Sequence, residues 1–319
     1  MATDLLDHRL LVVTGKGGVG KTTVAAALAW HAARSGKRVL VCELDAKGDL
    51  LSALTGADAA RSHALSFVPR EVHPRLHAMV MDPEASLKEY LKLNLRIPLV
   101  TRIGALSNAF DFLANAAPGV REIVTIGKLA YEVRERHYDL VIADAPATGH
   151  VVGLLRAPQA INELVGVGLI RSQTKWILDI LSSPATTGAV VVSTSEELPV
   201  TESIELIARL RTDIEVDAAA VVINRTLPQS LTSDDSRALH RLASSSSSDD
   251  PAMVTMLRGA LLLDQLTQIR APHLSRLLEA WTGPIAMVPT ITGQSPGLPV
   301  TRAVAGHLAD EFSLSAEPR

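Results

Sequence analysis

The sequence feature that most limits what this chain can fold into is an octapeptide near its start, GKGGVGKT at residues 15–22. A short apolar run at residues 9–14 precedes it, and an alanine-rich segment at residues 22–35 follows it. This order predicts a buried strand, a tight glycine-rich turn and a helix. The octapeptide matches the phosphate-binding pattern G-x-x-x-x-G-K-[ST] in the structural position that the pattern requires.

The chemistry of such a turn favours the phosphates of a nucleotide. Successive backbone N–H groups surround phosphate oxygens, and the helix N-terminus adds a partial positive charge. We expect Lys21 to neutralise the β and γ phosphates and the Thr22 hydroxyl to bind Mg²⁺. A glycine-rich turn with an unrelated lysine would not explain the flanking strand and helix. The residues expected to contact the nucleotide are Gly15, Lys16, Gly17, Gly18, Val19, Gly20, Lys21, Thr22 and Thr23.

The rest of the chain predicts an α/β fold with a mostly parallel sheet flanked by helices. Further continuous apolar runs, typical of strands buried on both faces, occur at residues 38–43, 78–81, 139–143, 189–192 and 218–223. Two segments with helical patterns, residues 83–136 and 157–182, predict a helical subdomain inserted into a single domain of residues 1–319. The polar, serine-rich residues 229–251 are expected to form a flexible surface loop.

Composition excludes several classes of protein. With 31 basic and 34 acidic side chains the formal charge is −3, so we expect no nucleic-acid partner. The single cysteine, Cys42, excludes a disulfide framework or a four-cysteine zinc site within one chain. The longest uncharged stretch, residues 280–301, contains four prolines and three glycines, so we expect no membrane span. The start of the chain lacks the pattern of a secretory signal, and we expect a cytoplasmic protein.

Lys16, directly after the first glycine, is not required by the general pattern. Together with GGVGKTT it resembles the signature lysine of the deviant Walker A ATPases. In that family this lysine reaches across a nucleotide-sandwich dimer to the phosphates of the other subunit. The family includes ParA, MinD, the nitrogenase iron protein, and the arsenite-pump ATPase ArsA with its tail-anchored-protein-targeting (Get) relatives. The resemblance implies that ATP is the nucleotide and that Lys16 acts in catalysis.

The string DAPATGH at residues 144–150 resembles the D-T-A-P-T-G-H switch II of the ArsA and Get branch. An acid that ends a buried strand beside this phosphate-binding loop is suited to hold Mg²⁺, and we expect Asp144 to do so through water. The resemblance makes Gly149 and His150 part of a segment that moves when the γ phosphate is lost. A packing or solvent-facing role for His150 stays an open alternative.

Two more residues are assigned through the same resemblance. Asp45, just after the second predicted strand, occupies the switch I position and would orient the attacking water; a helix N-cap is the alternative. The family usually has D-P-A there, whereas this chain has D-A-K. Asn224, at the end of a predicted strand, matches the asparagine that contacts adenine, because an amide can both donate and accept. A turn residue after a strand is its alternative.

These assignments predict a Mg-ATP-dependent dimeric ATPase of the ArsA-like family. The chain has one phosphate-binding loop, so its partner would be a second copy or a paralogue, giving a homodimer or a heterodimer. A client protein or membrane partner would bind the helical segments. One alternative, a MinD- or ParA-like spatial regulator, is disfavoured because residues 300–314 lack a basic helix. A weakly catalytic nucleotide-sensing scaffold stays open because of the D-A-K sequence.

Overall fold

The structure is a computed structural model that describes residues 5–45, 48–56, 64–95, 119–164, 169–227, 231–245 and 251–314. Within these residues, eight strands form one sheet in the order β3-β4-β2-β5-β1-β6-β7-β8. Every pairing is parallel except that of β3 with β4. The predicted α/β fold class is confirmed. The strands are β1 (Leu10–Gly15), β2 (Val39–Glu43), β3 (Arg70–His73), β4 (Leu76–Val80), β5 (Leu140–Ala147), β6 (Thr187–Ser193), β7 (Ala218–Thr226) and β8 (Ile285–Pro289).

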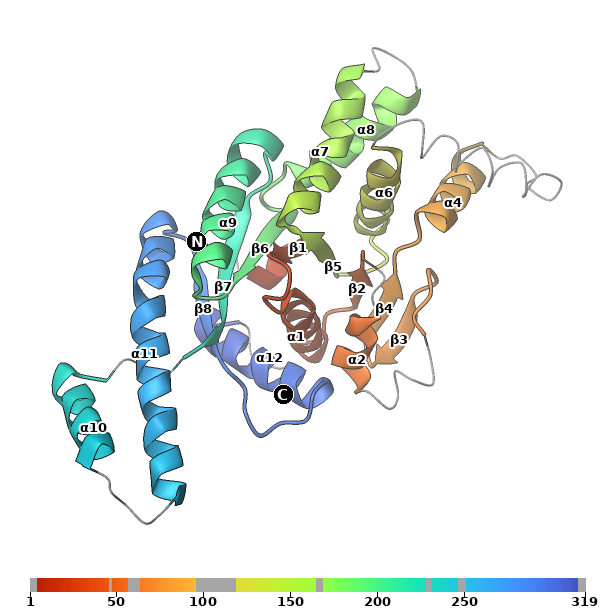
Figure 1. Cartoon of the computed structure of the whole chain (residues 1–319). Helices are drawn as coiled ribbons and strands as arrows, with labels where there is room; N and C mark the ends of the chain where they lie inside the picture. Colours follow the sequence, from red (N-terminus) through yellow and green to blue (C-terminus); the bar gives the residue numbers. More distant parts are fainter. Residues whose placement is uncertain are drawn as a thin grey trace.

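Helices cover both faces of this sheet (Figure 1). Alternate residues of β1 show why: Leu11 and Val13 belong to one apolar core, and Leu10 and Val12 belong to the other. Side chains alternate along a strand, so a strand buried on both faces must be apolar throughout. The helices are α1 (Lys21–Arg34), α2 (Asp49–Thr55), α4 (Pro83–Leu95), α6 (Val120–Arg134), α7 (Thr148–Leu164), α8 (Leu169–Leu181), α9 (Glu197–Arg209), α10 (Ser233–Ser245), α11 (Pro251–Ala280) and α12 (Leu298–Phe312), with short helical turns at Leu5–Asp7 and Leu210–Ile214.

The two cores are built by different helices. Buried residues of α1, α2 and α12 pack on one face of the sheet, and buried residues of α6, α7, α8 and α9 pack on the other. Helices α4, α6, α7 and α8 lie together at one side of the molecule (Figure 1). They correspond to the predicted helical segments, although residues 96–118 lie outside the described part of the chain. The division of the chain into one domain with a helical subdomain stays a prediction.

The start of the second helical segment was predicted too late. Helix α7 begins at Thr148, directly after β5, rather than at residue 157. Val151, Val152 and Leu155 are buried in the core beneath it, at the spacing of one helix face. Gly149 is therefore in the first turn of a helix and not in a loop.

The prediction of a flexible loop over residues 229–251 was wrong for its central part. Residues 233–245 form α10, which lies beside the long helix α11 (Figure 1). Its start is stabilised by a backbone N–H of Asp235 that donates to the Thr232 hydroxyl over 3.1 Å. Ser236 also donates to the buried Asp264 of α11 over 2.7 Å. A contact with a distant segment thus orders residues whose composition is typical of a loop.

In the described parts of the chain, no helix combines the length and the apolar character that crossing a membrane requires.

Candidate functional site

The phosphate-binding loop joins the end of β1 to the start of α1, and two of its glycines cannot be replaced without strain. Gly15 has φ +147°, and a Cβ there would lie 2.0 Å from the Val192 carbonyl oxygen of β6. Gly20 has φ +97°, and a Cβ there would lie 2.3 Å from Nδ2 of Asn224. Only glycine fits both the positive φ and the close approach of neighbouring strands. The loop is therefore seated tightly on β6 and β7.

The end of β7 holds the loop from the side. Asn224 is buried, and its Nδ2 donates to the carbonyl oxygen of Val19 over 2.8 Å. Arg225, which the sequence analysis did not identify, donates from Nη1 to the carbonyl oxygen of Gly18 over 3.1 Å. The structure thus brings Asn224 to the loop, but in a contact that supports the loop backbone. Its contact with adenine stays a prediction.

Thr22, Lys21 and Asp144 meet at the carboxyl edge of the sheet. The Thr22 hydroxyl donates to Oδ2 of Asp144 over 2.7 Å, and Lys21 Nζ donates to the carbonyl oxygen of Lys16 over 3.2 Å. Asp144 is 6% exposed, and its Oδ1 has no hydrogen-bond partner among the described residues. A hydroxyl beside a carboxylate with a spare buried oxygen is a donor set that fits Mg²⁺. Thr22 and Asp144 are therefore the residues that could hold the metal.

The electrostatics of Asp144 agree with that fit. Burial raises the pKa of its carboxyl group to about 6, the hydrogen bond from Thr22 opposes this, and the nearby Glu43 carboxylate adds to it. A buried carboxylate whose charged form is disfavoured gains from a divalent cation.

Glu43 is a residue of this edge that the sequence analysis missed. It ends β2, pairs in register with Asp144 of β5, and is 2% exposed. Its Oε1 accepts a hydrogen bond from the backbone N–H of Asp49 over 3.2 Å at the start of α2. The available signal was a charged residue that ends the apolar run RVLVCE. Glu43 adds a second buried negative charge next to the candidate metal site.

Asp45 lies two residues beyond β2 at the same edge and is exposed. Its charge is near enough to contribute to the raised pKa of Asp144, after burial and the charge of Glu43. Ala46 and Lys47, which complete the D-A-K sequence, lie outside the described residues. The structure therefore brings Asp45 to the site, and its catalytic role stays a prediction.

Lys16 has a partner that the sequence analysis did not identify. Its Nζ forms an ion pair with Oε1 of Glu202 on α9. The other oxygen of that carboxylate, Oε2, accepts a hydrogen bond from the Thr148 hydroxyl over 2.8 Å. Thr148 belongs to the predicted switch II string, and the following residues Gly149 and His150 are exposed in the first turn of α7. The switch roles of these residues stay predictions.

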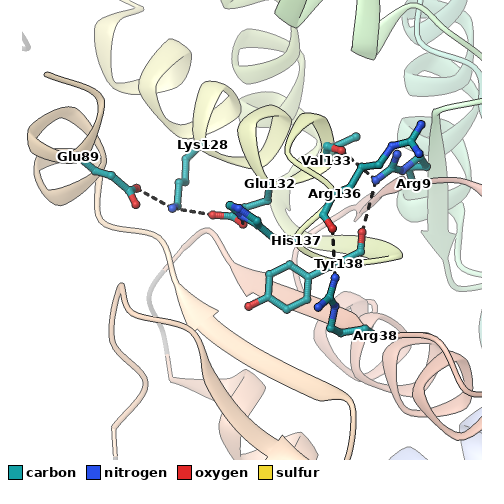
Figure 2. A network of polar contacts seen from close by, with 9 residues as sticks. All are labelled: Arg9, Arg38, Glu89, Lys128, Glu132, Val133, Arg136, His137 and Tyr138. Carbon is teal, nitrogen blue, oxygen red and sulfur yellow. Dashed lines mark hydrogen bonds and ion pairs between the residues drawn. The ribbon is translucent and has the colours of Figure 1, made fainter. Parts of the chain in front are cut away.

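A second polar cluster extends from α4 along α6 to the residues that come just before β1 and β2 (Figure 2). Nζ of Lys128 on α6 forms ion pairs with Oε2 of Glu89 over 2.6 Å and with Oε1 of Glu132 over 2.7 Å. Oε2 of Glu132 is in turn 2.7 Å from Nδ1 of His137. The cluster borders an open cavity of about 450 Å³. We call this the far-end cluster, because Arg9 and Arg38, which flank it, come just before β1 and β2.

Comparison with known proteins agrees with the geometry of the carboxyl edge. The anion-transporting ATPase family matches residues 8–177 of the chain. ATPase BagA of Mycobacterium tuberculosis is 31% identical over 233 residues, which cover 71% of this chain and 68% of that protein. ATPase get3 of Schizosaccharomyces japonicus is 29% identical over 249 residues, covering 68% of this chain and 74% of that protein.

ATPase GET3 of Podospora anserina is 28% identical over 182 residues, or 55% of this chain and 51% of that protein. The family match covers more than half of the chain and includes the phosphate-binding loop, both predicted switch positions and Thr148. The predicted resemblance and the ATPase activity are therefore confirmed: the chain belongs to the anion-transporting ATPase family.

Proposed function

We propose that this chain is a Mg-ATP-dependent ATPase that works as a dimer and couples ATP binding and hydrolysis to the capture or release of a client protein or membrane partner. The observation that carries the proposal is the convergence of Lys16, Lys21, Thr22, Asp45 and Asp144 at one edge of the sheet. Parallel α/β sheets bind ligands at the carboxyl ends of their strands.

In the proposed reaction, the loop N–H groups and Lys21 bind the β and γ phosphates and hold the terminal phosphate for in-line attack by water. Mg²⁺ would supply charge neutralisation at these phosphates, and Thr22 and Asp144 would hold it. Asp45 would orient the attacking water. We expect Asp45→Asn to retain ATP binding and to slow turnover by about a hundredfold; an equal loss of binding and rate would make Asp45 structural.

The proposed dimer brings a second copy or a paralogue against the carboxyl edge, so that Lys16 contacts the nucleotide of the other subunit. Closure of this dimer would move the start of α7, because β5 runs into it without a loop. Helix α7 packs on α6 and α8, and a change at its start would reach the surface of the helical segments. That surface is the proposed docking place for the client.

A mixing experiment tests the dimer. Lys16→Ala subunits should bind Mg-ATP but fail to dimerise and to hydrolyse it, because Lys21 and the loop remain while the contact across the dimer is lost. Lys21→Ala subunits should also be inactive. A mixture of the two contains heterodimers with one site that combines an intact Lys21 and the partner's Lys16, so part of the turnover should return.

Sedimentation velocity with ATP must accompany the mixture, because strict coupling of two sites would prevent the recovery even when the geometry is correct. A Lys16→Ala protein that dimerises on ATP and turns over at the wild-type rate would overturn the proposed function.

A further inference from the structure

One carboxylate, that of Glu202, connects the phosphate-binding loop to the start of α7. Oε1 pairs with Lys16 Nζ, and Oε2 accepts from the Thr148 hydroxyl over 2.8 Å. The three residues come from three elements: the loop after β1, helix α9, and the first residue of α7. We call this three-residue contact the Glu202 bridge. The contact is partly exposed, with 28% of the Lys16 side chain and 26% of the Glu202 side chain accessible.

The bridge competes with the role that Lys16 has in the proposed function. The N–H donors of an ammonium group that point to a carboxylate on its own chain are not available to the phosphates of a nucleotide held by another chain, so the ion pair opposes that contact. A triphosphate carries more negative charge than one carboxylate, so it attracts Lys16 more strongly than Glu202 does. Moving Lys16 to the triphosphate costs the free energy of one exposed ion pair, the one with Glu202. The hydrogen bonds of Glu202 to Lys16 and Thr148 lower the pKa of its carboxyl group. The carboxylate therefore stays charged and keeps its attraction for Lys16 at neutral pH.

The hydrogen bond between Glu202 and Thr148 connects the release of Lys16 to the predicted switch II. Thr148 is the first residue of α7, and the carbonyl oxygen of Pro146, two residues earlier, accepts a hydrogen bond from the Thr14 hydroxyl of β1 over 3.3 Å. The junction of β5 and α7 is thus attached to β1 through Pro146 and to α9 through Thr148. Release of Lys16 leaves Glu202 with Thr148 as its remaining partner in the bridge, which changes the contacts at the start of α7.

We propose that Glu202 is a positioning residue of the ATPase: it holds Lys16 on its own chain through the Glu202 bridge, and Lys16 must leave it before the two-subunit site can form. This inference rests on the proposed function, because it needs Lys16 to act on a nucleotide across a dimer. It adds a residue, Glu202, and a coupling to Thr148 that the family match does not assign.

The test is Glu202→Gln, which removes the charge and keeps the size of the side chain. The matched control is Glu205→Gln, an identical change on the exposed surface of α9 one turn away. Exposed ion pairs shift an equilibrium by about two- to fivefold. Glu202→Gln should therefore lower the protein concentration for half-maximal ATP-dependent dimerisation, and the half-saturating ATP concentration, by about that factor. Turnover at saturating protein and ATP should stay unchanged, and Glu205→Gln should match the wild type.

Two further readouts separate this role from a merely structural one. The difference between Glu202→Gln and the wild type should shrink at high salt, because an ion pair is screened and packing is not. Thr148→Val should shift dimerisation in the same direction as Glu202→Gln, whereas Thr148→Ser, which keeps the hydroxyl, should restore the wild-type value.

Three results would overturn the inference, and they can be told apart. If Glu202→Gln equals Glu205→Gln in dimerisation while Lys16→Ala is inactive, the bridge has no role and the proposed function stands. If folded Glu202→Gln is as inactive as Lys16→Ala, then Glu202 is required in the active arrangement and does not hold Lys16 away from it. If Lys16→Ala is fully active, the proposed function fails first.

Discussion

The two ends of the same parallel strands carry polar clusters of opposite character. At the carboxyl ends, Asp144 is buried with one oxygen that has no hydrogen-bond partner in the described part of the chain, and the buried Glu43 lies next to it. At the other ends, the far-end cluster pairs its charges: Lys128 contacts two carboxylates, and both oxygens of Glu132 have partners (Figure 2). At the carboxyl ends burial disfavours the charged form of Asp144, whereas the far-end cluster pairs its charges within the chain.

The contacts made with the backbone also differ between the two ends. In the far-end cluster, Arg9 donates to the carbonyl oxygens of Val133 over 2.9 Å and of Tyr138 over 3.5 Å, and Arg38 donates to that of Arg136 over 3.1 Å. These bonds satisfy carbonyl groups at the end of α6 and in the turn after it, and they fasten both to the residues that precede β1 and β2. At the carboxyl ends, the loop N–H groups are instead proposed to bind a phosphate. The comparison indicates that buried charge serves cohesion in the far-end cluster, whereas its use in binding at the carboxyl ends stays a proposal.

The largest effect is expected when the charge of Lys21 is removed from the carboxyl-edge site. Lys21→Ala should reduce turnover by at least about a hundredfold, because neither the loop N–H groups nor a metal replaces a charge aimed at the β and γ phosphates. The free energy of unfolding should change little. Steady-state ATPase assays and urea denaturation measure the two quantities, and near-wild-type turnover in a homogeneous sample would remove the phosphate-binding assignment.

The matched change at the far-end cluster should lower the free energy of unfolding and leave turnover unchanged. Lys128→Met leaves the buried Glu132 carboxylate without its cation, and we expect the free energy of unfolding to fall by about 3 kcal/mol. Turnover per folded molecule should stay at the wild-type value. The double variant Lys128→Met with Glu132→Gln should recover part of the loss, since it removes both charges. Urea denaturation that shows no loss for Lys128→Met would contradict the assigned role of this cluster.

Removal of a charge at the carboxyl edge should instead stabilise the fold. The pKa of Asp144 is raised from its ordinary value of 3.8 to about 6, so the folded chain holds a proton that the unfolded chain releases between these values. Wild-type stability should therefore fall as the pH rises from 3.8 to about 6 and stay lower above it. Asp144→Asn should abolish this dependence and should be more stable at pH 7.5 by about 2 kcal/mol.

The same variant should lose the metal-dependent activity, because an amide carries no negative charge for Mg²⁺ and a carboxyl group holds a metal only when it is deprotonated. In the wild type, the Mg²⁺ concentration for half-maximal turnover should rise as the pH falls below about 6. An Asp144→Asn protein that is less stable than the wild type at pH 7.5 would show that its charge is already balanced within the chain.

The smallest effect is expected for changes at Cys42, which lies between the two ends of the strands. Cys42 is fully buried in β2, and burial together with the Glu43 charge raises the pKa of its thiol. Reductants should leave turnover unchanged, and alkylation by iodoacetamide should be slow until the chain unfolds. A chelator that spares Mg²⁺ should not alter the oligomeric state; a chelator that splits the dimer would reveal an additional metal site.

The sequence by itself determined the strand, glycine-rich turn and helix around Lys21, and the five further parallel strands of the central sheet. These elements are readable because the apolar runs and the glycine pattern are local, and because a strand buried on both faces tolerates few polar residues. It also predicted that Asp45, Asp144 and Asn224 share one edge, since Asp45 follows a parallel strand and the other two lie in the last part of parallel strands, which end on the same side of a sheet.

The tertiary structure alone decided the remaining features. The edge strand β3 is polar and partly exposed, the edge strand β8 is apolar but short and partly exposed, and α10 is ordered by its contact with Asp264 of α11. The pairing of Glu43 with Asp144 depends on which strands are neighbours, and the contact of Lys16 with Glu202 joins residues 186 positions apart. Hydrophobic periodicity specifies elements and their buried faces, whereas polar pairs between distant residues are set only when those elements pack.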